Sequence, residues 1–188
     1  MITIMRITEF SIDLLPQTEP TISIAAIAPT ADRMEATARL GAIVPRGLAA
    51  PNAAGIIRQA CARLIDQLQP SSRMTIRSVI ADDIIMGPQQ AARLGLIASE
   101  LLANAVVHAH PTGVIGEIEL KCARDVAGGV LLEINDDGIG LPEAFNPGTD
   151  CGSGLRVVRA VAEDLGASVR FNSGGCGLSV EVRVPSQA

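Results

Sequence analysis

Apolar residues recur every three to four positions along Leu94–His110, and this spacing predicts a helix that packs on a core. The apolar positions are Leu94, Ile97, Ala98, Leu101, Leu102, Ala105 and Val106. Glu100, Asn104 and His108 repeat at intervals of four residues, so their row drifts by only about 40° per step around the helix. The helix therefore carries a carboxylate, a carboxamide and an imidazole in one line, although a solvated polar face would give the same pattern.

Similar spacing predicts two further helices. One follows Pro51-Asn52 and extends to about Leu68, and the other spans Leu155–Leu165 and ends at Gly166. The central helix itself is expected to begin at Gly87-Pro88, because proline is well tolerated in the first helical turn.

Short runs with alternating or continuous apolar residues predict the strands. These runs are Met74–Ile80, Ile84–Met86, Gly116–Lys121, Val130–Asn135, Ser168–Phe171 and Leu178–Val184. Turns at Ala127-Gly128-Gly129 and around Asn172–Gly177 join the last four into two hairpins. From Pro51 onward the order is helix, two strands, helix, two strands, loop, helix and two strands, which indicates one domain of mixed α and β structure.

Residues 1–50 give weaker signals and are punctuated by prolines. Ile2–Leu15 alternates in part, Thr21–Ala28 is a short apolar run, and Arg33–Val44 has the pattern of a short capped helix. This helix has an apolar stripe that either packs on the domain's own core or forms a face for a partner or a second copy. The stripe consists of Ala36, Leu40, Ile43 and Val44.

Composition narrows the function classes. The net charge of −5, the absence of Trp and Tyr and the presence of only three Phe argue against a nucleic-acid partner. No apolar run approaches the roughly 18 residues of a membrane-spanning helix, and Glu9 and Asp13 interrupt any signal-peptide core. The four cysteines are far apart in sequence, which favours free thiols and a cytoplasmic protein without a membrane partner.

Two scarce residue types constrain the chemistry. Lys121 is the only lysine and lies in a predicted strand, so the glycine-rich phosphate loop that requires Gly-Lys-Ser/Thr is excluded. His108 and His110 are the only histidines, so any histidine chemistry of this chain must use one of them.

Two glycine-rich segments follow the central helix. Asp136 comes directly after an apolar strand and before Gly138 and Gly140, so its carboxylate could accept a hydrogen bond from an exocyclic amine while the glycines let a flat ring approach. Gly152-Ser153-Gly154 precedes a helix, whose free N–H groups and positive dipole end suit phosphates. Taken singly, each segment could equally be an ordinary turn or loop.

The three elements together, in this order, are more specific. Glu-x-x-x-Asn on a helix, Asp-x-Gly-x-Gly after a strand and Gly-x-Gly-Leu at a helix start resemble the N, G1 and G2 boxes of the GHKL superfamily, which includes gyrase, MutL and histidine kinases. LGLIASELLANAVVHA, DDGIGLPEAFNP and GSGLRVVRAVAEDLGA look most like the ATPase domains of HWE-type and related sensor histidine kinases. The resemblance implies the Bergerat ATP-binding fold over residues 51–188, a two-layer α/β (α+β) sandwich with helices on one face of a mixed, mostly antiparallel sheet.

The resemblance also implies roles for individual residues. Asn104 stands at the position of the magnesium ligand that bridges metal and phosphates, and Glu100 at that of the acidic residue that orients or polarises the attacking group. Asp136 corresponds to the acceptor of the adenine amine, with Gly138 and Gly140 beneath the ring. The expected cofactors are ATP and Mg²⁺. Residues expected to cradle the phosphates are Gly152, Gly154 and Leu155.

This chain departs from the family pattern in several places. Residues 1–92 contain no histidine, so we expect no autophosphorylation at the family's usual upstream position. Residues 1–50 would be either a histidine-less remnant of the dimerisation region or an unrelated extension. Val107 replaces a frequent basic residue, the tryptophan of HWE-type kinases is missing, and Leu178 stands where many relatives have a threonine near the adenine.

Three hypotheses for function follow. The first is a cytoplasmic Mg-ATP-binding module, possible as a homodimer, that passes phosphate to a separate protein in two-component-type signalling. The second is a non-catalytic adaptor or pseudokinase that binds a response regulator or another kinase. The third is an anti-sigma-type serine kinase, and the lid sequence between Leu141 and Cys151 favours the first over it.

Overall fold

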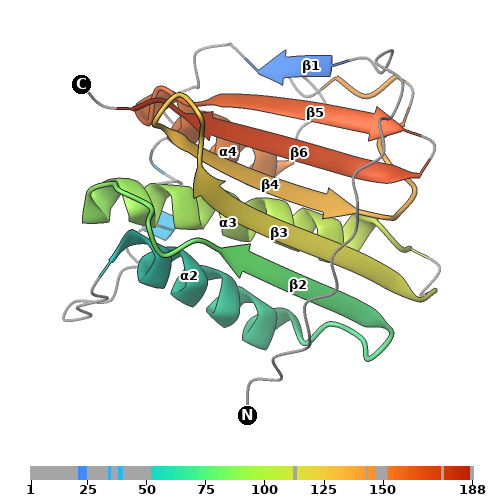
Figure 1. Ribbon diagram of the computed structural model, residues 1–188. Helices are drawn as coiled ribbons and strands as arrows, with labels where there is room; N and C mark the ends of the chain where they lie inside the picture. The colour runs from blue at the N-terminus through green and yellow to red at the C-terminus, as the bar shows by residue number, and fades with distance from the viewer. Residues whose placement is uncertain are drawn as a thin grey trace.

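The computed structural model describes residues 21–24, 34, 38–39, 52–111, 114–142, 144–146, 152–174 and 176–186. Within this part of the chain, a six-stranded sheet is covered on one face by helices α2, α3 and α4 (Figure 1). The elements are β1 Thr21–Ile24, α2 Ala53–Leu68, β2 Met74–Ile80, α3 Pro88–His108, β3 Gly116–Arg124, β4 Val130–Asp136, α4 Ser153–Asp164, β5 Ser168–Gly174 and β6 Gly177–Val184.

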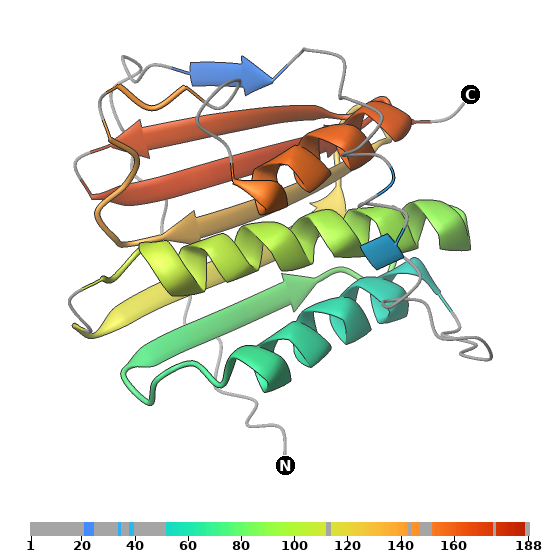
Figure 2. The same ribbon diagram turned by 180° about the vertical axis from the view of Figure 1, so that it is seen from behind.

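The strand order is β1-β5-β6-β4-β3-β2. Only β2 and β3 pair in parallel, while the other four pairings are antiparallel. Seen from behind, the three helices lie side by side across the same face of the sheet, with α3 in the middle (Figure 2). The predicted two-layer sandwich with a mixed, mostly antiparallel sheet is therefore confirmed.

Alternation along the strands places one apolar row under the helices. Leu120 of β3 is paired with Ile134 of β4, and Ile134 with Val180 of β6, and all three side chains are buried. Glu119 and Lys121 flank Leu120 and point to the open face, where they form an ion pair. Burial of one face by α2, α3 and α4 thus fixes the register, because a slip by one residue would bury these charges.

The central helix α3 owes its place to its apolar face. Leu94, Ile97, Ala98, Leu101 and Leu102 are each no more than 3% exposed, as the spacing predicted. Glu100 and Asn104 are half-buried, and His108 is exposed. Within this polar row, Glu100 and Asn104 lie close to the start of α4, where a Cβ on Gly154 would approach both side chains.

Most predicted boundaries agree with the structure within a few residues. Helix α2 begins after Asn52, whose side chain accepts a hydrogen bond from the N–H of Gly55 at 2.8 Å, and α4 is followed by Gly166 with φ of 63°. The strands β3 and β5 extend further than predicted, to Arg124 and Gly174, because pairing with β4 and β6 continues beyond their apolar residues.

The strand predicted at Ile84–Met86 is wrong. This segment is a loop between β2 and α3, in which Ile84 is buried while Ile85 is 76% exposed. One buried side chain anchors the loop to the core, and in the part of the chain that the structure describes these three residues pair with no strand. A run of three apolar residues does not distinguish a short strand from a loop that buries one side chain.

Residues 21–24, within the predicted N-terminal extension, form strand β1 and pair with β5 at the edge of the sheet. Residues 34, 38 and 39 are helical, in agreement with the helix predicted at Arg33–Val44. The predicted strand at Ile2–Leu15 and all four residues of the predicted apolar stripe fall outside the described residues. No helix in the described part is long and apolar enough to cross a membrane.

The cysteines that the structure describes are free thiols. Cys61 and Cys122 are buried, and burial raises the pKa of each thiol to about 12, whereas Cys176 is exposed. The two buried thiols therefore stay protonated at neutral pH and act as small apolar side chains in the core.

Candidate functional site

A pocket of about 590 Å³ opens between the second half of α3, the start of α4 and the ends of β4, β5 and β6. Six of the eight predicted site residues line it, whereas Glu100 and Gly138 do not. The six are Asn104, Asp136, Gly140, Gly152, Gly154 and Leu155. Residues separated by up to 51 positions in sequence are thus brought around one cavity.

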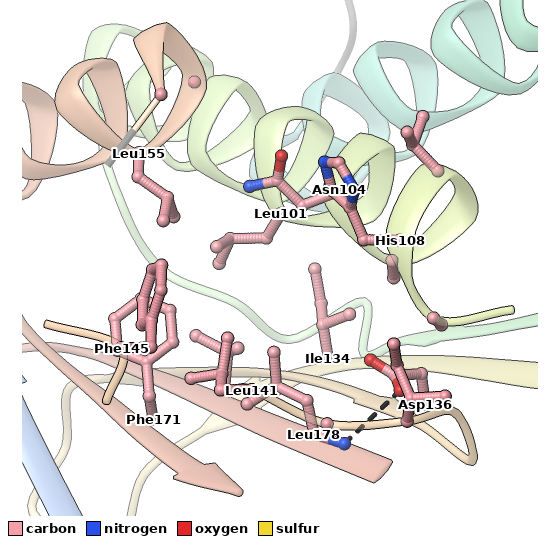
Figure 3. Close-up of a pocket in the computed structure, with 18 of the residues that line it drawn as sticks. Leu101, Asn104, His108, Ile134, Asp136, Leu141, Phe145, Leu155, Phe171 and Leu178 are labelled. Atoms are coloured by element: carbon pink, nitrogen blue, oxygen red, sulfur yellow. Dashed lines mark hydrogen bonds between the residues drawn. The ribbon is translucent and has the colours of Figure 1, made fainter. Parts of the chain in front are cut away.

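Apolar side chains form most of the pocket wall. Figure 3 shows Leu101 and Leu155 on the helix side, facing Leu141, Phe145 and Phe171 across the cavity. Ile134 and Leu178 continue this surface toward Asp136. Such a slot suits a flat, largely apolar ring system that is oriented by few polar groups.

Asp136 supplies the polar group at one end of the slot. It is the last residue of β4, and its Oδ1 accepts hydrogen bonds from the N–H of Gly138 at 3.0 Å and from that of Leu178 at 3.3 Å. The other carboxylate oxygen faces the cavity (Figure 3). Two backbone donors therefore hold the side chain in one orientation, with an acceptor directed at whatever occupies the slot.

The environment of Asp136 perturbs its ionisation. Burial raises the pKa of this carboxyl above its ordinary value, and the hydrogen bonds from Gly138 and Leu178 only partly offset the effect. The nearby His110 also lowers this pKa, and the neighbouring Asp137 raises it. A buried carboxylate gains most from a hydrogen-bond donor brought by a ligand.

His110 and Asp137 form a pair behind Asp136 that sequence reasoning missed. The His110 side chain is 5% exposed, and its Nε2 lies 2.9 Å from Oδ1 of Asp137, which also accepts the N–H of Glu117 at 2.7 Å. The imidazole packs on Gly116, where a Cβ would come within 2.3 Å of the ring. The pair ties the end of α3 to β3 and β4, and no periodicity marks a contact between a helix end and a strand end.

The two glycines of the Asp-x-Gly-x-Gly segment have structural reasons to be glycine. A Cβ on Gly138 would lie 2.2 Å from the carbonyl oxygen of Ala109, and the next residue, Ile139, donates its N–H to that same oxygen at 3.0 Å. Gly140 has φ of 69° and is packed against the β5–β6 hairpin. Gly138 thus lets the loop close on the end of α3, while Gly140 turns the chain into the pocket.

At the other end of the pocket, α4 begins with Gly152 as its N-cap, without a side-chain capping hydrogen bond. A Cβ on Gly154 would lie 2.9 Å from Oε2 of Glu100 and 3.7 Å from Oδ1 of Asn104. The helix start is therefore close to both polar residues of α3. Its free N–H groups and positive dipole end make this an anion-binding position.

Glu100 has a cationic neighbour from the N-terminal part of the chain. Arg39 Nη1 forms an ion pair with Glu100 Oε1, and Arg39 Nη2 lies 3.4 Å from Ser153 Oγ. Among the described residues, no group of three or more His, Cys, Asp or Glu side chains could hold a metal ion. The amide oxygen of Asn104 is of a type that magnesium accepts as a ligand, and this ion commonly completes its shell with phosphate oxygens and water.

Comparison with known proteins places these features in a family. The sequence profile of the histidine kinase-, DNA gyrase B- and HSP90-like ATPases matches residues 89–188. Blue-light-activated histidine kinase 2 of Erythrobacter litoralis is 32% identical over 108 residues, which are 57% of this chain and 31% of that protein. The sensor histidine kinase PdtaS of Mycobacterium tuberculosis is 29% identical over 109 residues, or 56% of this chain and 22% of that kinase.

Solved structures agree with the sequence comparison. The histidine kinase domain of an Erythrobacter litoralis blue-light-activated kinase has a TM-score of 0.66 and 28% identity, and the match covers 82% of this chain and 78% of that domain. A mycobacterial sensor kinase, MprB, shares the fold with a TM-score of 0.52 at 19% identity, over 69% and 92% of the two chains.

The aligned segments span less than a third of the two curated kinases. The profile, by contrast, covers more than half of this chain and includes α3, the Asp136 loop and α4. The protein therefore belongs to the histidine kinase-, DNA gyrase B- and HSP90-like ATPase family, and it resembles the ATPase domains of sensor histidine kinases.

Proposed function

We propose that this chain binds Mg-ATP in the pocket between α3 and α4 and serves as the ATPase module of a two-component-type signalling system. One observation carries the proposal: the same cavity has a fixed carboxylate at one end and an anion-binding helix start beside Asn104 at the other. Its volume of about 590 Å³ lies within the range of cofactor sites.

The adenine would occupy the apolar slot. The exocyclic amine of the base would donate to the Asp136 oxygen that faces the cavity, while the ring packs between Leu101, Ile134 and Leu178. His108 and Val107 also line the pocket at its helix side. Leu178, at a position where relatives often have threonine, contributes its backbone N–H to Asp136 instead of a hydroxyl to the base.

The phosphates would lie toward the start of α4, where Gly152 and Gly154 leave the backbone N–H groups accessible. Asn104 would supply one amide oxygen to magnesium, which in turn neutralises and aligns the phosphates. Glu100 would orient or polarise the attacking group from its place next to Gly154. These groups would position the reactants and neutralise their charge, which is what phosphoryl transfer chiefly requires.

Phosphate would pass to a separate protein. Two similar proteins are histidine kinases, and residues 1–107 of this chain contain no histidine. An acceptor histidine on a partner, such as a kinase, followed by a response regulator, would complete the reaction. The alternative function is that of an adaptor that binds nucleotide without turnover, and a serine kinase of the anti-sigma type is a second alternative.

The functional proposal is tested by measuring ATP binding and ATP turnover on the same preparation, together with Glu100→Gln. Binding with turnover that falls in Glu100→Gln supports a phosphotransfer module. Binding without turnover, unchanged when candidate acceptor proteins are added, would favour the adaptor. Absence of binding at millimolar ATP would refute both the phosphotransfer module and the nucleotide-binding adaptor.

Asn104→Ala should remove the magnesium dependence of ATP affinity. The side chain is half-buried beside the α4 start, so its amide oxygen is the protein ligand that we assign to the metal. We expect wild-type affinity for ATP to rise at least about tenfold when Mg²⁺ replaces EDTA, and to change less than about twofold in Asn104→Ala. Calorimetric titration measures both, and an equal magnesium effect in the two proteins would contradict the assignment.

Adenosine affinity should fall as the pH is lowered toward the acid range. Ionised Asp136 is a stronger acceptor for the base amine than the protonated carboxyl group. Because burial raises its pKa, binding should weaken at a pH above the ordinary value of 3.8. The affinity is complete above the raised pKa and is lost as the pH falls through it. Adenosine is the ligand of choice because it has no phosphate group that titrates. Asp136→Asn has no carboxyl group at this position, so its adenosine affinity should not change over the same pH range.

A further inference from the structure

The loop Asp136–Leu141 is held to the rest of the domain through its backbone N–H groups. In its middle, the N–H of Ile139 donates to a backbone oxygen, that of Ala109 at the end of α3, at 3.0 Å. At its end, the N–H of Leu141 donates at 2.7 Å to a side chain, the hydroxyl Oγ of Ser173 on β5. The last residue of the loop thus depends on one hydroxyl group that lies 32 residues further along the chain.

The β5–β6 hairpin contacts both ends of this loop through one pair of facing residues. Ser173 is paired with Leu178 in the hairpin. The N–H of Leu178 donates to Oδ1 of Asp136, where the loop begins, and the Ser173 hydroxyl accepts from the residue where the loop ends. A Cβ on Gly140 would lie 2.7 Å from Ser173 Oγ and 3.0 Å from the carbonyl oxygen of Gly177, so the loop also packs closely on the hairpin between these contacts.

Ser173 affects the pocket through Leu141. Alternate residues of a strand face the same side, so Ser173 lies on the side of β5 that carries the buried Phe171, which lines the pocket. Leu141 also lines the pocket, and Figure 3 shows it beside Phe171 and Leu178 on the strand side of the cavity. Ser173 itself is not one of the lining residues, so its hydroxyl holds the wall in place from behind.

We propose that Ser173 is a positioning residue of the nucleotide site, whose hydroxyl holds Leu141 against the adenine ring. This inference rests on the proposed function, because Leu141 borders the apolar slot that we assign to the base. Without the hydroxyl, the half-buried N–H of Leu141 would lose its acceptor, and the end of the loop would turn toward water to regain one. The wall opposite Leu101 would then lose its fixed position, while the phosphate end at α4 would be unaffected.

The first test is a calorimetric titration of the full chain with Mg-ATP and with adenosine. In Ser173→Ala we expect both affinities to fall by the same factor, about three- to tenfold, because the wall that changes contacts only the base. Ser173→Thr keeps the hydroxyl and should retain more of both affinities than Ser173→Ala. Ser179→Ala is the matched control: Ser179 precedes the buried Val180 on β6, faces the open side of the sheet, and should not affect either affinity.

Hydrogen exchange of the Leu141 amide, followed by NMR without nucleotide, tests the contact itself. We expect this amide to exchange at least about tenfold faster in Ser173→Ala than in the wild type, because its hydrogen bond is lost. In Ser179→Ala the rate should be that of the wild type. An unchanged rate in Ser173→Ala would show that the hydroxyl does not hold Leu141.

The binding data can also overturn the inference. Unchanged affinities in a folded Ser173→Ala protein would do so, as would a loss for ATP without a loss for adenosine. A Ser173→Thr protein that protects the Leu141 amide but binds as weakly as Ser173→Ala would show that the hydroxyl contact does not serve the base. Thermal unfolding checks that each variant is folded. Failure of the wild-type protein to bind ATP would instead defeat the proposed function, even if Ser173 protects the Leu141 amide as expected.

Discussion

Replacing Asp136 with asparagine is expected to lower ATP affinity by at least about 100-fold. The two backbone N–H groups of Gly138 and Leu178 require an oxygen at the inner position, so the asparagine amide would direct its NH₂ group into the pocket. A donor would then face the amine of adenine, which is also a donor. Loss of a hydrogen bond to a charged acceptor is worth about 1.5–3 kcal/mol, and the opposed donors add to it.

The same variant should remain folded. Asparagine keeps the acceptor for both N–H groups, and it removes a buried carboxylate whose raised pKa disfavours the ionised form. The sign follows from linkage: stability from a raised carboxyl pKa is present at low pH and is lost as the pH rises through that value. At neutral pH we therefore expect the free energy of unfolding of Asp136→Asn to equal or exceed that of the wild type. Unchanged ATP affinity in a folded variant would contradict the assignment of Asp136.

Replacing Gly138 with alanine is expected to destabilise the protein by about 2 kcal/mol or more. The added Cβ would lie 2.2 Å from the Ala109 carbonyl oxygen and 2.6 Å from its Cα, both of which are backbone atoms at the end of α3. A clash with backbone cannot be relieved by a change of rotamer, so the loop or the helix end must move. Chemical unfolding followed by circular dichroism measures the loss.

The matched control for this change is Gly152→Ala. No atom lies within 4 Å of a Cβ at Gly152, and its φ of −66° is accessible to alanine, so the loss should stay below about 1 kcal/mol. Because Ile139 donates to the same Ala109 oxygen, Gly138→Ala should also displace the Asp136 loop and weaken ATP binding. Equal stability of the two alanine variants would show that the loop does not close on α3 as described.

The sequence predicts the secondary structure well wherever burial is one-sided. The central helix, the two later helices and the strands that pair within the sheet follow directly from apolar spacing, because each has one face under a neighbour. Ile84–Met86 was predicted wrongly since its one buried residue anchors a loop. Edge strand β1 lies in a segment with weak signals, and its pairing with β5 is set by tertiary contact.

The sequence predicts which residues form the candidate site, but it does not predict the contacts between distant segments that hold the site together. Asn104 and Asp136 stand out in the sequence because their side-chain chemistry recurs at motif spacing, and the structure lines one pocket with both. The placement of Gly138 against Ala109, the His110–Asp137 pair and the contact of Arg39 with Glu100 all join distant parts of the chain. Local patterns carry no information about such contacts.

The most direct measurement is a calorimetric titration of the wild-type protein with ATP and, in parallel, with GTP in the presence of Mg²⁺. A carboxylate at Asp136 can accept from the amine of adenine but faces an oxygen acceptor in guanine, so the base decides the affinity. The account predicts micromolar binding of ATP and at least about 100-fold weaker binding of GTP. Equal affinities, or no heat of binding with millimolar ATP, would contradict it.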